Sequence, residues 1–322
     1  MKRRNFAALC LLPWATTGLT QAQSWPDKPI KFILSQPAGS GPDNVARILG
    51  ERLARTMGQA VVIDNKPGGQ NVIGAQTAAR SVADGYTFYF ATTAALVTNS
   101  YLFKTLPYDP QKDFVPVAFV AKSPFAVLVK ADSPIASMQD LVARSKAKPG
   151  TLSVANEGPR TFGGLIARVI NARTQAQVNL VGYANVGMAV QDVIGGHADA
   201  VVADLASTAQ LVRQGRLRLL AVTSAKRVTG WEQVPALAEL LPGFEMIGWF
   251  GLVAPTGTPQ GVIARVNDEL NKLLADREVA DRILAIGPMV EASGAPEQFA
   301  NFLREEYQRW AVVAKEIGLL PE

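Results

Sequence analysis

A glycine-rich turn is the part of this sequence whose residue types best suit ligand binding. It reads Gln36-Pro37-Ala38-Gly39-Ser40-Gly41-Pro42-Asp43, between a short apolar run and a segment with apolar residues at helical spacing. The N–H groups of Gly39, Ser40 and Gly41 should then lie at the start of a helix, where unbonded backbone donors favour a carboxylate or a phosphate. The same residues fit a capping box with Ser40 at the N-cap and Asp43 at N3, and both interpretations can hold together.

Polar residues also follow the other predicted strands. In the first half of the chain, Thr92 and Thr93 follow the strand 86–91. In the second half, a strand-turn-helix order recurs, and the strand ends lead into the turn 156–161, residues 182–187 and Asp204. Because the carboxyl ends of parallel strands meet at one edge of a sheet, this order predicts two α/β lobes whose loops face one cleft.

The residues available for catalysis or metal binding are few. The single histidine, His197, lies in a Gly-Gly-His turn, where we expect it to be solvated, and the single cysteine, Cys10, lies near the N-terminus. No Cys/His cluster, P-loop or Gly-x-Ser-x-Gly motif occurs in the sequence. We therefore expect no enzyme activity, no metal site and no cofactor.

Two other classes of protein remain as alternatives. A dinucleotide-binding enzyme could use the Gly39-Ser40-Gly41 turn, with Asp64 as the acid that binds a ribose. Against it, Asn44 stands where that motif has its third glycine, and Pro42 removes one N–H group. An exported scaffold that binds other proteins is the other alternative, although paired loops around a cleft are more typical of small-ligand sites.

The first 22 residues have the pattern of a signal peptide. Lys2, Arg3 and Arg4 precede an apolar run, and Thr20-Gln21-Ala22 predicts cleavage after Ala22 and export to the periplasm. The arginine pair leaves the general and the twin-arginine export routes open. The formal net charge of +5 becomes +2 once these three basic residues are removed, which is too weak to indicate nucleic-acid binding.

Several motifs, in order along the chain, resemble the Bug-type solute-binding receptors of tripartite tricarboxylate transporters. They are Trp25-Pro26-Asp27-Lys28-Pro29-Ile30, the turn 37–43, Asn65-Lys66-Pro67-Gly68-Gly69, Asp84-Gly85-Tyr86-Thr87, Leu106-Pro107-Tyr108-Asp109-Pro110, Ala221-Val222-Thr223-Ser224-Ala225-Lys226-Arg227 and 251–259. The resemblance covers essentially the whole mature chain. It implies a type II periplasmic-binding-protein fold, α/β in class, with two lobes and a ligand cleft between them. We expect lobe 1 to comprise residues 23–122 with 249–322, and lobe 2 to comprise residues 123–248.

The resemblance also implies the function. A monomer of this family binds a small organic or amino-acid carboxylate and delivers it to the permease subunits in the membrane. The ligand-binding residues that the family's loops imply here are Gln36, Pro37, Ala38, Gly39, Ser40, Asp43, Thr92, Thr93, Asn156, Thr161, Tyr183, Asn185 and Asp204.

Three charged residues of these loops need separate predictions. Asp43 is expected to cap the helix or to meet an ammonium group, since a ligand carboxylate beside it would be repelled. Arg160 follows the strand that ends at Ala155, and we predict that its guanidinium contacts the ligand carboxylate. Alternatively, Arg160 pairs with Glu157 and only shapes the loop.

Overall fold

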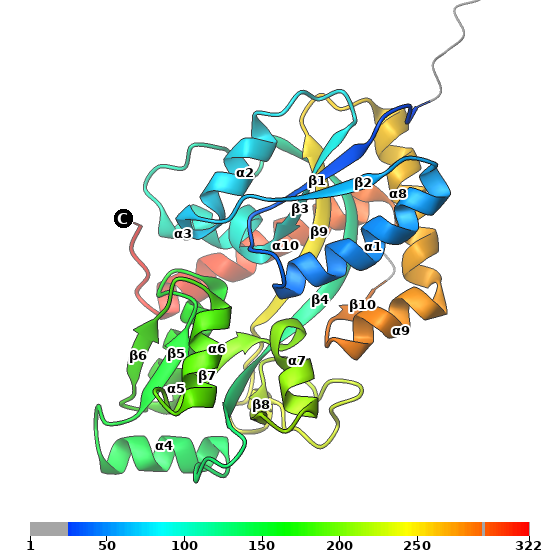
Figure 1. Ribbon diagram of the computed structural model, residues 1–322. Helices are drawn as coiled ribbons and strands as arrows, with labels where there is room; N and C mark the ends of the chain where they lie inside the picture. The colour runs from blue at the N-terminus through cyan, green and yellow to red at the C-terminus, as the bar shows by residue number, and fades with distance from the viewer. Residues whose placement is uncertain (1–24, 292–293, 322) are drawn as a thin grey trace, which may run out of the picture.

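A sheet of ten strands runs through both lobes of the computed structural model, which describes residues 25–291 and 294–321 (Figure 1). The order of its main path is β2-β1-β3-β9-β4-β7-β5-β6, with β8 and β10 (Met289–Val290) each paired to β4. The predicted signal peptide, residues 1–22, lies outside the described residues. In the part of the chain that is described, no helix combines the length and the apolar character needed to cross a bilayer.

Lobe 1 is built from the first three strands, which are parallel. They are β1 (Ile30–Leu34), β2 (Val61–Asn65) and β3 (Thr87–Thr92). The first helix, α1 (Gly41–Met57), buries Val45, Leu49 and Leu53 against the sheet and ends where Gly58 takes a left-handed backbone with φ 69°. The other helices of this lobe are α2 (Val72–Ala79), α3 (Asn99–Leu102), α8 (Gln260–Ala275), α9 (Arg277–Ala285) and α10 (Pro296–Glu316).

Lobe 2 repeats the parallel strand-helix arrangement. Its parallel strands are β5 (Ser153–Asn156), β6 (Asn179–Gly182) and β7 (Ala200–Asp204), and β8 (Leu217–Val222) pairs antiparallel with β4. The helices are α4 (Met138–Ala147), α5 (Phe162–Thr174), α6 (Val186–Gly195) and α7 (Leu205–Arg213). The two α/β lobes confirm the predicted fold class, and the carboxyl ends of their parallel strands face each other across one cleft.

Two long antiparallel strands join the lobes. They are β4 (Phe114–Lys130) and β9 (Ile247–Pro255), paired from Phe114 opposite Pro255 to Pro124 opposite Ile247. Strand β4 continues through Ser123-Pro124 without a break. The proline is tolerated because the ladder with β9 ends there and the ladder with β7 begins at Phe125.

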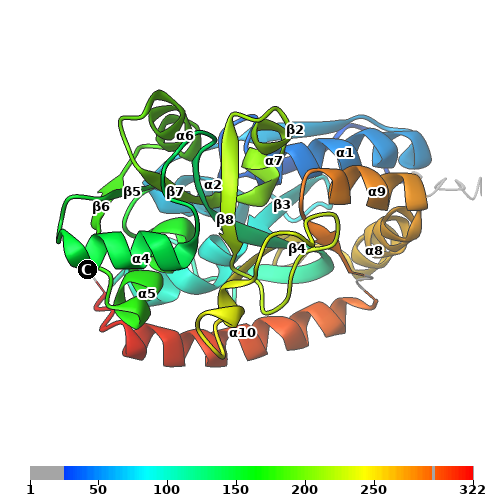
Figure 2. The same cartoon turned by 90° about the horizontal axis from the view of Figure 1, so that it is seen from below.

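Helix α10 extends along both lobes (Figure 2). At its start, Phe299 packs on Gly251 of β9 so closely that a Cβ atom on that glycine would lie 2.2 Å from the ring. At its end, Arg173 of α5 makes two hydrogen bonds of 2.7 Å to Glu316. The helix therefore braces lobe 2 against lobe 1 on the side away from α1.

Candidate functional site

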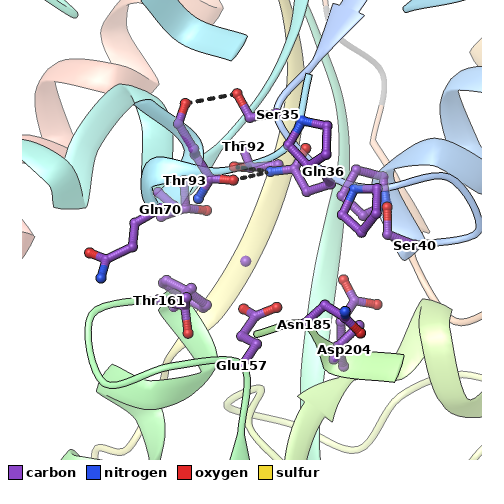
Figure 3. A pocket seen from close by; sticks show the side chains of 18 of the residues that line it. Ser35, Gln36, Ser40, Gln70, Thr92, Thr93, Glu157, Thr161, Asn185 and Asp204 are labelled. Atoms are coloured by element: carbon purple, nitrogen blue, oxygen red, sulfur yellow. Dashed lines mark hydrogen bonds between the residues drawn. The ribbon is translucent and has the colours of Figure 1, made fainter. Parts of the chain in front are cut away.

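A cavity of about 440 Å³ lies between the two lobes. Lobe 1 contributes the loops after β1, β2 and β3, and lobe 2 contributes the loops after β5, β6 and β7 (Figure 3). Its lining includes Ser35, Gln36, Pro37, Ser40, Gln70, Asn71, Thr92, Thr93, Phe125, Glu157, Thr161, Phe162, Asn185, Asp204, Ser207, Trp249 and Phe250. The cavity is therefore the place where the predicted strand-end loops converge.

Neutral polar groups line the lobe 1 side. The Nε2 atom of Gln36 donates to Asn71 Oδ1 at 2.8 Å and to Thr92 Oγ1 at 3.2 Å, and the N–H of Trp249 donates to Thr93 Oγ1 at 3.0 Å. Each threonine hydroxyl thus accepts a hydrogen bond, while its own hydrogen has no acceptor among the described residues. Both hydroxyls are consequently available to donate to an anionic group in the cavity.

The loop between β2 and α2 approaches the cavity in an unusual backbone conformation. Gln70 and Asn71 have φ values of 55° and 76°, which residues other than glycine rarely adopt. The side chain of Asn99 donates to the Gln70 carbonyl at 3.0 Å, and the Ser35 hydroxyl donates to the Asn71 carbonyl at 2.9 Å. Such strain, held by surrounding hydrogen bonds, is found most often at functional sites.

Two carboxyl groups occupy the lobe 2 side. Asp204 ends β7 and caps α7, accepting from the Ser207 N–H at 3.3 Å and from the Ser123 hydroxyl at 3.1 Å. Its burial raises the pKa to about 7; the Ser123 hydrogen bond opposes this rise, and the charge of Glu157 adds to it. Asp204 is therefore an acid that titrates near neutral pH.

The second acid, Glu157, lies in the loop between β5 and α5 and points into the cavity (Figure 3). Burial raises the pKa of Glu157, against the opposing effects of the Gly163 N–H and the Thr161 hydroxyl. No lysine, arginine or histidine is present among the described residues that line the cavity. Lobe 2 thus presents two acids without a basic side chain in the lining to balance them.

Aromatic rings form an apolar wall beside these polar groups. Phe125 and Phe162 meet edge to face with ring centroids 5.1 Å apart. Trp249 lies on β9, and its Nε1–H donates to the buried carboxylate of Glu306 at 2.8 Å. These contacts hold the rings in place, so the wall can pack against the apolar part of a ligand.

The glycine-rich turn differs from its prediction. The N–H of Gly39 donates to Asp43 Oδ2 at 2.8 Å, that of Ser40 to the Pro37 carbonyl at 3.2 Å, and that of Gly41 to Ser207 Oγ at 3.1 Å. All three predicted anion donors are thus used within the protein. Gly39, with φ 81°, allows the turn to fold back onto Asp43.

The capping box is also incomplete. Ser40 is the N-cap residue of α1, but its hydroxyl makes no capping bond. Asp43 receives hydrogen bonds from Gly39, from Arg47 Nε at 2.9 Å and from Asn65 Nδ2 at 3.0 Å. Burial alone would raise the pKa of Asp43, but these bonds and the Arg47 charge hold it below its usual value. The carboxylate therefore organises the turn from behind the cavity.

The structure separates the predicted site residues into two groups. Those in the cavity lining are Gln36, Pro37, Ser40, Thr92, Thr93, Thr161, Asn185 and Asp204. Ala38 and Gly39 line a neighbouring hollow, and Asp43, Asn156, Arg160 and Tyr183 lie outside the lining. The Asn156 side chain accepts from the Gly158 N–H, and the Tyr183 hydroxyl donates to Asp192. Ligand contacts by all of these residues stay predictions.

Arg160 and Glu157 turn in different directions. The guanidinium of Arg160 lies over the ring of Phe103 in lobe 1, with the Arg160 Cζ atom 5.9 Å from the ring centroid. Glu157 faces the cavity instead. Of these two residues, Glu157 lines the cavity and the predicted Arg160 does not. The lining also includes Ser35, Gln70, Asn71 and the aromatic wall, which the sequence did not predict, although the Pro67-Gly68-Gly69 loop at a strand end was a signal for Gln70 and Asn71.

The lobes touch directly beside the cavity. Gly41, the first residue of α1, lies so close to lobe 2 that a Cβ atom there would be 2.7 Å from Asp204 Oδ1 and 2.9 Å from Ala206 Cβ. The hydrogen bond from Gly41 to Ser207 crosses the same interface. The two lobes are therefore closed against each other at this edge.

Known proteins share both the sequence and the fold. The family model described as tripartite tricarboxylate transporter family receptor matches residues 45–319. Protein BugT of Bordetella pertussis is 33% identical over 311 residues, covering 94% of each chain. The structure of Rhodopseudomonas palustris Rpa4515 with adipate superposes with a TM-score of 0.89 at 30% identity, covering 92% of this chain and 100% of that one. The structure of MatC of the same organism, with bound malate, superposes with a TM-score of 0.83 at 26% identity, covering 90% of this chain and 99% of that one.

Proposed function

The chain belongs to the tripartite tricarboxylate transporter receptor family, and from this premise we propose that it captures a small organic or amino-acid carboxylate in the periplasm. The lobes close on the ligand, and the closed receptor delivers it to the permease subunits of a transporter in the membrane. The protein acts as a monomer and catalyses no reaction. The signal peptide, residues 1–22, is removed after Ala22 on export.

The cavity between the lobes is the observation that carries this proposal. The hydroxyl groups of Thr92 and Thr93 can donate to a carboxylate on the lobe 1 side, while Glu157 and Asp204, when they are ionised, repel a carboxylate on the other side. The ligand carboxylate therefore lies against lobe 1. The relatives solved with adipate and malate support a carboxylate as the ligand class.

The joining strands supply the hinge in this proposal. Lobe 1 comprises residues 23–122 with 249–322, and lobe 2 comprises residues 123–248. Both predicted boundaries fall inside paired strands, β4 and β9, and α10 spans the lobes beside them. Closure then requires only a small bend of these strands, because the rest of each lobe moves as a unit.

A thermal-shift screen of carboxylates tests the function. We expect at least one small carboxylate to stabilise the protein by about 2.7 kcal/mol at a hundredfold excess over Kd, because it binds only the folded, closed form. The protein should first be unfolded, dialysed and refolded so that no carried ligand remains. Turnover of a substrate, with no stabilisation by mono-, di- or tricarboxylates, aromatic acids or amino acids, would contradict the proposal.

Two threonines of β3 provide a matched pair for this screen. Thr92→Val removes a cavity hydroxyl at nearly constant shape and should reduce the stabilisation by the best ligand. Thr87→Val, at the other end of the same strand, should leave it unchanged. If the ligand stabilises both variants equally, Thr92 does not contact the ligand.

Arg160→Ala distinguishes two roles of the arginine. A direct bond to the ligand carboxylate would be worth about 1.5 to 3 kcal/mol, so its loss would weaken binding more than tenfold. A contact with Phe103 across the lobes would be worth about 0.5 to 1 kcal/mol, which is a loss of a few fold. We expect the smaller loss, because Arg160 lies over that ring and outside the cavity lining. Isothermal titration should then show similar losses of ligand affinity for Arg160→Ala and Phe103→Leu. A loss of affinity of more than tenfold for Arg160→Ala alone would instead support a direct bond from Arg160 to the ligand.

A further inference from the structure

The cavity has an uneven distribution of charge, which narrows the ligand class beyond a carboxylate. Lobe 2 supplies both ionisable side chains of the lining, Glu157 and Asp204, and the lining includes no basic residue within the described chain. The two carboxyl groups lie on the same side of the cavity, opposite Gln36, Thr92 and Thr93 (Figure 3). A second carboxylate on the ligand would lie beside these two acids and be repelled by their negative charge when they are ionised.

Polar atoms without partners also line the cavity. Three buried side-chain atoms in the lining have no hydrogen-bond partner within the described residues, namely Gln36 Oε1, Ser40 Oγ and Gln70 Oε1. All three are oxygens that can accept a hydrogen bond, and Ser40 is 6% exposed. The Gln36 amide is oriented by the two bonds that its nitrogen donates, so its oxygen is correctly placed. All three belong to lobe 1, and the Ser40 hydroxyl can donate as well as accept, so these atoms add neutral polar sites on the lobe 1 side and leave the two acids of lobe 2 as the charged groups of the lining.

An ammonium group complements the two ionised acids of lobe 2. It carries a positive charge and three N–H donors, and it has no lone pair to accept a bond. Both acids are already oriented in the structure. The Ser123 hydroxyl and the Ser207 N–H donate to Asp204, and the Thr161 hydroxyl and the Gly163 N–H donate to Glu157. The rings of Phe125, Phe162 and Trp249 lie beside the cavity and would cover an apolar spacer.

We infer that the ligand is an amino carboxylate, whose ammonium group lies against Glu157 and Asp204 and whose carboxylate faces Thr92 and Thr93 across an apolar spacer. This inference rests on the receptor function proposed above and names the ligand class of the same cavity. The two charged ends point to opposite lobes, so the ligand itself bridges the cleft and favours closure.

Matched ligand pairs test the inference. Each pair differs in one end only: succinate and 4-aminobutanoate, adipate and 6-aminohexanoate, and terephthalate and 4-(aminomethyl)benzoate. Isothermal titration with the refolded full mature chain at pH 8 should show that the amino member binds at least tenfold more tightly in every pair that binds. Tighter binding of the dicarboxylate member would overturn the inference and leave the receptor function standing. Binding of no carboxylate, in these pairs or in the broad screen, would overturn both.

Variants of the two acids locate the ammonium group. Glu157→Gln and Asp204→Asn should each weaken binding of the amino member about tenfold or more, as expected for loss of a charged hydrogen bond. Each variant should also reduce the ratio of the affinity for the amino member to the affinity for the dicarboxylate. Glu245→Gln, a change of the same kind at an exposed residue outside the cavity, should alter neither affinity. Circular dichroism would confirm that each variant is folded. If folded Glu157→Gln and Asp204→Asn both bind the amino member as tightly as the native protein, the ammonium group lies elsewhere and the inference fails.

Discussion

Gly41→Val is expected to lower ligand affinity at least a hundredfold while leaving the ligand-free fold intact. A Cβ atom on this glycine would lie 2.7 Å from Asp204 Oδ1 and 2.9 Å from Ala206 Cβ, both in the opposite lobe. The two γ-carbons of valine would add to this overlap, so the lobes could not close at this edge. Each lobe alone would be undisturbed, because the overlap exists only between them.

The comparison variant for this experiment is Gly261→Val. Gly261 lies in the first turn of α8, as Gly41 does in α1, but a Cβ atom there would have no neighbour within 4 Å. Titration with the most strongly stabilising carboxylate should therefore show native affinity for Gly261→Val and little or no binding for Gly41→Val. Small-angle scattering should detect a more open form of Gly41→Val, with no compaction on addition of ligand. Native affinity of Gly41→Val would mean that binding does not require the closure seen here.

Asp204→Asn is expected to stabilise the ligand-free protein at neutral pH by up to about 4 kcal/mol. Burial raises the pKa of Asp204 from its ordinary value of 3.8 to about 7, so the folded protein keeps this proton over a pH range in which the unfolded chain has lost it. Stability then falls as pH rises from about 4 to 7, at about 1.4 kcal/mol per pH unit, and the loss is complete above the folded pKa. Asparagine is neutral at every pH and removes this cost.

Urea unfolding between pH 4 and pH 8 measures this effect. The difference in stability between Asp204→Asn and the native protein should be small at pH 4 and largest at pH 8. The exposed Asp132 provides the control, since Asp132→Asn should show no such trend. A difference that does not vary with pH would mean that Asp204 is ionised without cost in the folded protein. A residue that lowers stability while it lines a cavity is the pattern expected of a group retained for binding.

The elements and their order follow from local patterns in the sequence. The apolar stripe of α1, its end at Gly58, and the apolar runs of β1, β2 and β3 are local patterns, and each predicts its element without reference to the rest of the chain. The recurrence of strand, turn and helix then predicted two α/β lobes with their strand ends at one cleft. Those strand ends correctly brought Gln36, Thr92, Thr93, Thr161, Asn185 and Asp204 to one cavity.

The role of each loop residue, by contrast, depends on contacts that form only in the folded chain. A glycine-rich turn predicts free N–H groups, but whether they stay free depends on Asp43 folding back to Gly39 and on Ser207, 166 residues further along, accepting from Gly41. The direction of a side chain within a loop depends likewise on its packing, and for this reason Glu157 faces the cavity while Arg160 lies over Phe103. Local sequence patterns describe periodicity and backbone preference. Hydrogen-bond partners, buried charge and contact between lobes arise from residues that are distant in the sequence, so they become defined only when the chain is folded.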